Sequence, residues 1–309
     1  MPAALRKAFL CRDFLCAGMS VFNVTRNMFR YSPPLLLSAT IVAIHDVMMS
    51  FAQNKSPRRG RISMARRAGA NPENGPLMHG VALVTGGSRG IGRAIALRLA
   101  RLGSAVAICA RDTEALESTA AELRKLTPRV FSRPADVSCS KDVSDVVAET
   151  ETVLGSITVL VNNAGIGLFG PAHEQSEADW EHVLNTNLKS IFLMSRAVVP
   201  SMIRLGAGDI INIGSLAGHN TFSGGGLYCA SKWGVHGLSA CMAEDLRNHG
   251  IRVSVICPGS VVTEFSGRGS KDPSKALSPD DVAHAVAALV TQSPKSFISE
   301  VQLRPLRKP

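Results

Sequence analysis

The chain has 309 residues, of which 45% are hydrophobic, and its formal net charge at pH 7 is +10. This length allows one large domain or two small ones, and this apolar content is normal for a globular protein with a sizeable core. Residues 1–80 contain eleven Lys/Arg and three Asp/Glu, so they hold +8 of the charge and the remaining 229 residues carry only +2. The main part of the chain is therefore close to neutral, and its charge gives no case for nucleic-acid binding.

Residues 1–78 differ from the rest of the chain because they are basic and contain few acids. Three interpretations stay open: a transit peptide, an unstructured extension or misassigned start with translation beginning at Met64 or Met78, and a membrane anchor. The apolar run Leu35–Ile44 has ten residues, far fewer than the roughly 20 that span a bilayer, so we expect no membrane association. We therefore expect an N-terminal extension over 1–78 and one folded domain over 79–309, in the cytoplasm unless the extension targets an organelle.

From His79 onward, short apolar runs alternate with stretches of helical spacing. The apolar runs predict strands at Val81–Thr85, Ala105–Ala110, Val130–Ala135, Val159–Asn162, Ile210–Ile213 and Val253–Ile256. The stretches of helical spacing predict helices at Ala94–Leu102, Thr113–Leu126, Ser140–Leu154, Glu177–Leu205 and Leu227–Asn248. Strands that alternate with helices predict an α/β protein: a single domain with a doubly wound parallel sheet, the Rossmann fold, covered by helices on both faces.

A glycine-rich turn, Thr85-Gly86-Gly87-Ser88-Arg89-Gly90-Ile91-Gly92, joins the first predicted strand to the first predicted helix. Gly86 suits the tight turn, Gly90 lets the backbone approach a pyrophosphate, and Gly92 lets the helix pack on the sheet. The unpaired N–H groups at the start of the helix attract phosphates. The turn therefore predicts a dinucleotide site formed by Gly86, Ser88, Arg89, Gly90, Ile91 and Gly92.

The end of the second predicted strand indicates which dinucleotide is bound. Ala110 stands where an NAD enzyme usually places an acid for the ribose hydroxyls, and Arg111 follows it. A guanidinium binds a 2′-phosphate with two hydrogen bonds, whereas an acid repels it. Arg89 can reach the same phosphate, so two arginines predict NADP(H). Asp112 is a complication, because it could pair with Arg111.

Tyr228 and Lys232 stand four residues apart in a predicted helix, so their side chains share one face. A phenol with the ordinary pKa of about 10 is a poor acid or base at neutral pH, and a nearby ammonium lowers that pKa. Ser215 follows a predicted strand at the cleft side of the sheet, where its hydroxyl can stabilise a substrate oxygen that gains negative charge. The three residues predict acid/base chemistry on a carbonyl or alcohol.

From residue 80 to 303 the chain resembles the short-chain dehydrogenase/reductase family. The motifs that carry the resemblance, in family order and spacing, are Thr85-Gly86-x-x-x-Gly90-x-Gly92, Asp136-Val137, Asn162-Asn163-Ala164-Gly165, Asn187, Ser215, Tyr228-x-x-x-Lys232 and Pro258-Gly259-x-Val261-x-Thr263. The resemblance implies an NADPH-dependent oxidoreductase that moves a hydride between nicotinamide and a carbonyl or secondary alcohol. The 3-oxoacyl-carrier-protein reductases have similar motifs, so a 3-oxoacyl thioester is one candidate substrate.

The resemblance also implies a role for each residue. Tyr228 is expected to donate the proton in reduction, Lys232 to lower its pKa and hold the nicotinamide ribose, and Ser215 to orient the carbonyl. Asn187 is expected to hold a water that links Lys232 to solvent. The other expected cofactor contacts are Asp136 and Val137 at the adenine, Asn163, Ala164 and Gly165 at a ribose, and Pro258, Gly259, Val261 and Thr263 at the nicotinamide amide.

Oligomeric state and the alternative function are less constrained. The helices at 177–205 and 227–248 favour a homodimer, and a homotetramer is the alternative. The ending Glu300–Pro305 departs from the Gly-rich strand with which many tetrameric members of the family end. A non-catalytic dinucleotide-binding regulatory or scaffold protein of the same fold is the second functional hypothesis. The apolar candidates for a substrate pocket are Phe169, Phe222 and Phe265.

The seven cysteines are scattered, form no CxxC pair, and together with the histidines show no metal-ligand spacing. We therefore expect free thiols in a reducing compartment and no metal site. His219 lies on the loop after Ser215 and is interpreted as a solvated residue. His236 falls one helical turn beyond Lys232 and is interpreted as a packing or surface residue.

Overall fold

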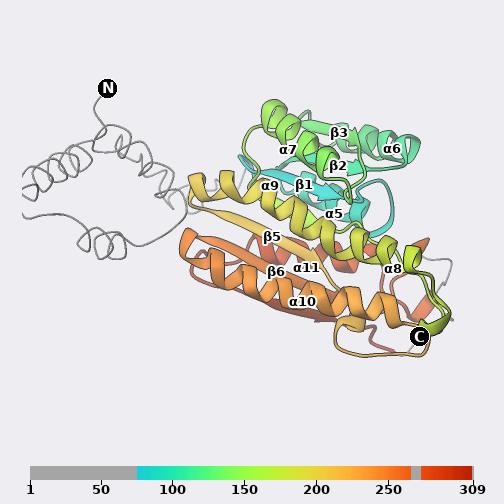
Figure 1. Ribbon diagram of the computed structural model, residues 1–309. Coiled ribbons are helices and arrows are strands. Elements are labelled where there is room, and N and C mark those ends of the chain that lie inside the picture. Colours follow the sequence, from blue (N-terminus) through green and yellow to red (C-terminus); the bar gives the residue numbers. More distant parts are fainter. Residues whose placement is uncertain (1–74, 266–272, 308–309) are drawn as a thin grey trace, which may run out of the picture. The chain divides into compact units, whose positions relative to one another are not determined.

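The computed structural model describes residues 75–265 and 273–307 (Figure 1). The extension expected over 1–78 therefore lies outside the described residues except for its last four. Within the described ranges, no helix is both long and apolar enough to cross a membrane.

The strands of the described residues form one parallel sheet of seven strands in the order β3-β2-β1-β4-β5-β6-β7. The strands are β1 (Val81–Thr85), β2 (Ala105–Ala110), β3 (Val130–Pro134), β4 (Val159–Asn162), β5 (Gly208–Ile213), β6 (Ile251–Pro258) and β7 (Glu300–Leu303). The order reverses between β1 and β4, and ligands of such sheets bind beyond the carboxyl ends of the strands at this switch point. The fold class predicted from the sequence is confirmed.

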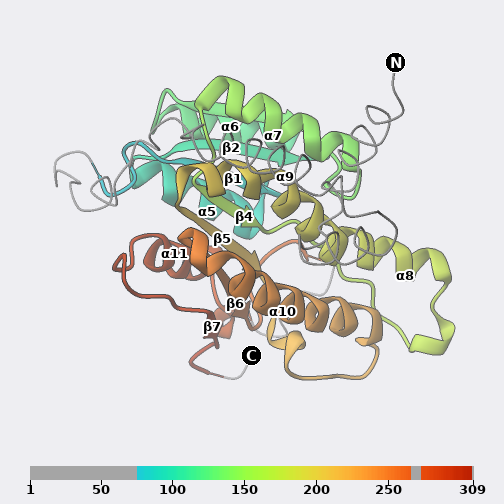
Figure 2. The same cartoon turned by 60° about the vertical axis from the view of Figure 1, so that its left-hand side comes forward.

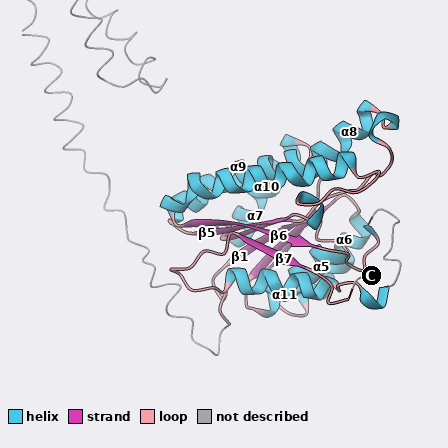
Figure 3. Cartoon of the chain, turned by 90° about the horizontal axis from the view of Figure 1, so that it is seen from below, coloured by secondary structure: helices cyan, strands magenta, loops and turns pink. Residues whose placement is uncertain are grey.

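Helices cover both faces of the sheet, as Figure 3 shows edge-on. They are α5 (Gly90–Arg101), α6 (Thr113–Arg124), α7 (Ser140–Leu154), α8 (Glu177–Leu184), α9 (Ser190–Leu205), α10 (Gly226–Leu246) and α11 (Pro279–Val290). One apolar cluster joins α5, α6 and α11 to the sheet, and a second joins α7, α9 and α10 to the other face. Neighbouring residues of a strand serve opposite clusters, as Val81 and Ala82 do, because side chains alternate across a strand.

The helix predicted over 177–205 is divided into three pieces. A π-helical turn, Asn185–Lys189, separates α8 from α9, and α10 packs against both α8 and this turn (Figure 2). Such turns widen the helix locally and re-aim the side chains on it. This turn carries Asn187, one of the predicted site residues, whose side chain is buried.

Two elements near the C-terminus were missed by the sequence argument. α11 has clear local signals: Ser278 and Asp281 form a capping box, and Pro279 occupies the first turn. β7 pairs with β6 at the edge of the sheet, and its residues alternate between exposed and partly buried. An edge strand of this kind has no continuous apolar run, which is the signal that predicted the other strands.

Candidate active site

The glycine turn between β1 and α5 has the backbone that a diphosphate site needs. Gly86 and Gly90 have φ of +63° and +55°, a region that favours glycine. A Cβ on Gly92 would lie 2.2 Å from the carbonyl oxygen of Gly86. The first turn of α5 has no acidic residue and no side-chain cap, so its N–H groups and the positive end of its dipole are available to phosphate oxygens. The turn fits a dinucleotide.

The residues after β4 form hydrogen bonds to the glycine turn and hold it in place. The Thr85 hydroxyl oxygen accepts hydrogen bonds from the backbone N–H groups of Asn163 and Ala164, both at 3.0 Å. The Asn163 amide donates to the carbonyl oxygens of Thr85, at 3.0 Å, and Gly86, at 3.2 Å. Next to them, a Cβ on Gly165 would lie 3.2 Å from Asn187 Oδ1. The Asn163 side-chain amide therefore holds the turn, and its expected contact with the ribose stays a prediction.

The two arginines expected at the 2′-phosphate differ in their surroundings. Arg89 forms ion pairs with Asp112 and, at 3.2 Å, with Glu264, and Asp112 also accepts a hydrogen bond from Ala115 N–H as the cap of α6. The expectation that Asp112 could pair with Arg111 is wrong, because the Arg89 side chain reaches it across the turn. Arg111 is exposed and forms no ion pair with any described residue, so its guanidinium is available to a phosphate.

Two other residues of the glycine turn, Ser88 and Ile91, connect it to α6 and to the hydrophobic core. Ser88 is buried, and its carbonyl oxygen accepts a hydrogen bond from the Thr119 hydroxyl at 2.8 Å. Ile91 packs against the apolar cluster beneath the sheet. These contacts join the turn to α6 and the core.

Tyr228, Lys232 and Ser215 are brought together at the carboxyl end of β5. Tyr228 and Ser215 share a side-chain hydrogen bond, and the Ser215 hydroxyl oxygen also accepts from Ala217 N–H at 3.1 Å. Lys232 Nζ lies 5.7 Å from the centre of the Tyr228 ring and donates to the Ile213 carbonyl oxygen at 2.8 Å. The spacing in the sequence therefore corresponds to a real cluster of a phenol, a hydroxyl and an ammonium.

The pKa values of this cluster differ from the sequence expectation. Burial raises the pKa of Tyr228, and the hydrogen bond with Ser215 only partly opposes this rise. Burial also lowers the pKa of Lys232 to about 8. Burial is therefore the largest influence on the pKa of the phenol, and the lowering expected from Lys232 stays a prediction.

Asn187 closes the site from the side of the π-helical turn. Its Oδ1 accepts from Ile166 N–H at 2.7 Å, and its Nδ2 donates to the Ile166 carbonyl oxygen at 2.9 Å and to Ser231 Oγ at 3.0 Å. The Ser231 hydroxyl in turn donates to the Tyr228 carbonyl oxygen at 2.7 Å. Asn187 therefore ties the loop after β4 to the first turns of α10, which carry Tyr228 and Lys232.

The adenine and nicotinamide ends of the expected site lie on loops after β3 and β6. Asp136 Oδ1 accepts from the N–H and hydroxyl of Ser138, at 2.9 and 2.7 Å. Burial alone raises the pKa of Asp136, but these hydrogen bonds and the nearby Arg111 and His182 together outweigh it and hold the pKa below its usual value. Val137 is buried in the core, and its contact with the adenine stays a prediction.

The loop after β6 reaches the glycine turn. Pro258 ends β6, and Gly259 N–H donates to the Leu303 carbonyl oxygen of β7 at 2.8 Å. Val261 forms a bridge with Leu277. A Cβ on Gly90 would lie 3.4 Å from the Thr263 methyl group, so Thr263 faces the start of α5.

Three phenylalanines form an aromatic wall at Tyr228. They are the residues that the sequence named as candidates for a substrate pocket, and that role stays a prediction. The ring centre of Tyr228 lies 5.6 Å from that of Phe169 and 5.9 Å from that of Phe265. Phe222 lies 5.9 Å from Phe169. Phe222 and Phe265 remain exposed, so apolar surface is available to a ligand beside the phenol.

Comparison with known proteins agrees with this geometry. The family model described as short chain dehydrogenase matches residues 80–274. A 3-oxoacyl-[acyl-carrier-protein] reductase of Staphylococcus epidermidis is 36% identical over 229 residues, which cover 71% of this chain and 94% of that protein. An uncharacterised oxidoreductase of Staphylococcus saprophyticus is 35% identical over 227 residues, or 73% of this chain and 97% of that protein.

A solved structure extends the comparison to three dimensions. The crystal structure of a metagenomic short-chain oxidoreductase in complex with NADP has a TM-score of 0.67 at 44% identity, and covers 75% of this chain and 99% of that chain. The chain therefore belongs to the short-chain dehydrogenase family of oxidoreductases.

Proposed function

We propose that the protein reduces a carbonyl group with NADPH and that Tyr228 donates the proton. The observation that carries the proposal is the cluster of Tyr228, Ser215 and Lys232 at the carboxyl end of β5, next to the aromatic wall: the Tyr228 and Ser215 side chains interact, and Lys232 Nζ lies 5.7 Å from the centre of the Tyr228 ring. Two hydroxyls in this arrangement can bind one carbonyl oxygen and stabilise the charge that it gains.

Bound NADPH supplies the hydride, and the protein supplies the proton and the positioning. The raised pKa of Tyr228 keeps its phenol protonated at neutral pH, which is the state that a proton donor needs. The Ser215 oxygen accepts from Ala217 N–H, which orients the hydroxyl. Lys232, with a pKa of about 8, is mostly charged at pH 7, and its ammonium favours the phenolate that forms when the proton leaves.

The cofactor preference rests on Arg111. Its exposed guanidinium follows β2 directly, at the position that contacts the adenosine ribose in this fold. Asp136, with its lowered pKa, is an acceptor suited to the adenine amine. The metagenomic relative was solved with NADP, which supports the same choice for this chain.

For the substrate we propose a compound with a carbonyl group and an apolar portion, with a 3-oxoacyl thioester as the first candidate. The aromatic wall formed by Phe169, Phe222 and Phe265 supports an apolar portion next to the reacting carbon. The Staphylococcus epidermidis relative is a 3-oxoacyl-[acyl-carrier-protein] reductase, which supports the thioester.

NADPH oxidation with acetoacetyl thioesters and with simple ketones tests both parts of the proposal. Tyr228→Phe is expected to lower kcat by about 10²–10⁴-fold, the usual contribution of a general acid, while NADPH affinity stays unchanged. The matched control is Tyr31→Phe, which alters the other tyrosine of the chain. Retained turnover in Tyr228→Phe would refute the assigned acid. If the unmodified chain binds NADPH but oxidises none with any carbonyl, the scaffold hypothesis replaces the enzyme.

We also propose that residues 79–309 are the catalytic domain and that residues 1–78 are an extension. The family model matches residues 80–274. The same assay on a chain that begins at Met78 should give unchanged kcat and KM. Cell fractionation of both chains tests the expected cytoplasmic location, because a chain with a transit peptide would appear in an organelle.

For the assembly we propose a homodimer, with a homotetramer as the alternative. Large apolar side chains are exposed on the helices expected at the contact: Trp180 on α8, Phe192 on α9 and Trp233 on α10. A second subunit would remove this surface from water. Sedimentation of the full chain tests the proposal, and a monomer at micromolar concentration would contradict it.

A further inference from the structure

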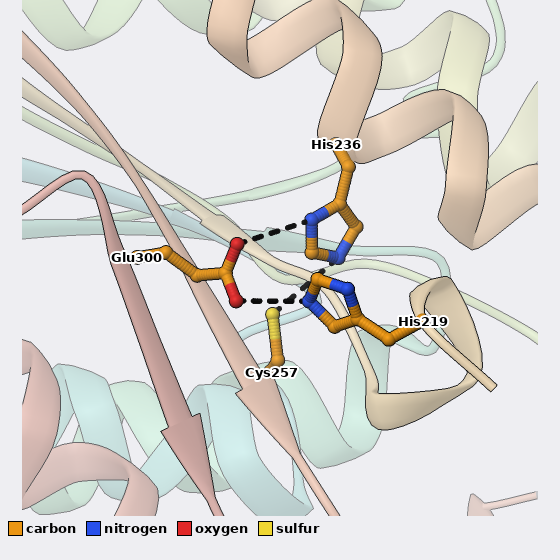
Figure 4. A group of neighbouring side chains, drawn as sticks. All are labelled: His219, His236, Cys257 and Glu300. Carbon is orange, nitrogen blue, oxygen red and sulfur yellow. Dashed lines mark hydrogen bonds and ion pairs between the residues drawn. The ribbon is translucent and has the colours of Figure 1, made fainter.

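Four potential metal ligands that are distant in the sequence meet beside the active site. His219 follows the 3₁₀ turn Leu216–Gly218, His236 lies on α10, Cys257 on β6 and Glu300 at the start of β7. Figure 4 shows the four side chains pointing toward one another. One donor atom from each lies within 4.8 Å of all the others. The sequence analysis expected no metal site, because no two of these residues have a recognisable ligand spacing.

The distances within this cluster are close to those of a four-coordinate site. Cys257 Sγ lies 3.4 Å from His236 Nε2, and His219 Nε2 lies 2.8 Å from Glu300 Oε1. With one donor atom from each residue, all four lie within 4.8 Å of one another. Tetrahedral zinc with bonds of about 2.0–2.3 Å places its donor atoms roughly 3.3–3.8 Å apart. The pair of His236 and Cys257 already has this spacing, and the pair of His219 and Glu300 needs a small separation.

We propose that His219, His236, Cys257 and Glu300 form a binding site for Zn²⁺. The donors comprise two imidazoles, one thiol and one carboxylate, the set from which protein zinc sites are built. Mg²⁺ and Ca²⁺ prefer oxygen ligands only, so the nitrogen and sulfur donors select against them.

The surroundings permit an ion to enter and the ligands to adjust. The side chains of His219 and Glu300 are 33% and 34% exposed, so the cluster is open to solvent on one side. A cavity of about 120 Å³ lined by His236, Glu300 and neighbouring residues gives both side chains room. The Cys257 thiol loses its proton when it binds a metal, because coordination favours the thiolate.

The role of such a site is structural, because four protein ligands leave no open position for a substrate. Its ligands come from the loop after Ser215, from the helix one turn beyond Lys232, and from the residue before Pro258. The fourth ligand is on the edge strand β7, which pairs only with β6 among the described strands. The ion would therefore fasten the edge strand to the three segments that carry the active site.

Zn²⁺ titration of the full chain after removal of metal by a chelator tests the proposal. At a free Zn²⁺ concentration of about 100 times the Kd, the Tm should rise by about 5–10 °C, and chelator should reverse the rise. Mg²⁺ at the same concentration should leave the Tm unchanged. Co²⁺ should give the visible absorption of a tetrahedral site together with a thiolate charge-transfer band.

Variants assign the binding to this cluster, since the chain holds other cysteines and histidines. His219→Ala and Glu300→Gln change partly exposed residues, and each should weaken Zn²⁺ binding more than about 10-fold. Loss of a residue that only hydrogen-bonds to a metal ligand can already cost about 10-fold, so loss of a ligand should cost more. Cys257→Ser should abolish the charge-transfer band. The controls His173→Ala and Cys241→Ser alter exposed residues elsewhere and should bind as the unmodified chain does. Absence of a Tm rise, or a rise that persists in His219→Ala and Glu300→Gln, overturns the proposal.

Discussion

The lack of space for a Cβ at Gly92 leads to a specific prediction for the variant Gly92→Ala. The new Cβ would lie 2.2 Å from the Gly86 carbonyl oxygen and 2.5 Å from Asn163 Nδ2, whereas ordinary contact begins at 3.4 Å. The nearer neighbour is backbone and cannot rotate away, so α5 and the turn must separate by roughly 1 Å. The substitution therefore moves the helix N-terminus that is expected to bind the diphosphate.

Both stability and binding should respond to this movement. Overpacking of this kind costs about 1–3 kcal/mol of unfolding free energy. A misplacement of about 1 Å at a positioned group is enough for a loss on the order of 100-fold, which we expect in NADPH affinity. Turnover at low NADPH should fall in proportion, because Tyr228 and Ser215 are not touched by the change.

The matched control is Gly237→Ala, the same substitution in the interior of α10. A Cβ on Gly237 meets nothing within 4 Å, so the variant should gain about 0.5–1 kcal/mol from the lower flexibility of alanine. Urea unfolding and NADPH titration of both variants provide the measurement. If Gly92→Ala binds NADPH as tightly as the unmodified chain and unfolds at the same urea concentration, the close packing is not what requires glycine there.

Two further predictions concern the cofactor phosphate and the catalytic lysine. Arg111→Asp should lower the ratio of kcat/KM with NADPH to kcat/KM with NADH by about 10–100-fold, because a hydrogen bond to a charged group contributes about 1.5–3 kcal/mol. An unchanged ratio would mean that Arg111 does not bind the 2′-phosphate. Burial lowers the pKa of Lys232 from 10.5 to about 8. Between these two pH values the unfolded chain therefore binds more protons than the folded protein. The free energy of unfolding then rises with pH across this range, by up to about 3 kcal/mol. In Lys232→Met, urea unfolding at pH 7 and pH 10 should no longer show this contribution to the unfolding free energy. An identical pH dependence in the variant and in the unmodified chain would contradict the burial of a charged lysine.

Local sequence signals were sufficient for most of the sheet and helices. The apolar runs of β1 and β4 are buried along their whole length, and that of β2 is buried except at its last residue. Such strands can be identified without knowledge of their neighbours. β7 could not be identified in this way, because an edge strand is partly exposed. The π-helical turn Asn185–Lys189 has no local signature either, and it determines where Asn187 points.

The candidate site was predicted as a set of residues but not as a set of contacts. The motifs identified Tyr228, Ser215 and Lys232 correctly as neighbours, because spacing on one helix and position after a strand determine which residues can meet. The partner of Asp112 is Arg89 rather than Arg111, and this pairing depends on how the glycine turn and the start of α6 face each other. No pattern in the sequence contains that orientation.

The sequence alone determined the family, the parallel sheet and the set of residues expected to be catalytic, because these follow from periodicity and from motifs of fixed spacing. Only the tertiary structure decided the pKa of Tyr228 and the meeting of His219, His236, Cys257 and Glu300. Desolvation depends on everything that surrounds a group, and the cluster combines four segments that are distant in the chain. Both are properties of packing, so they arise only when the helices and strands have come together.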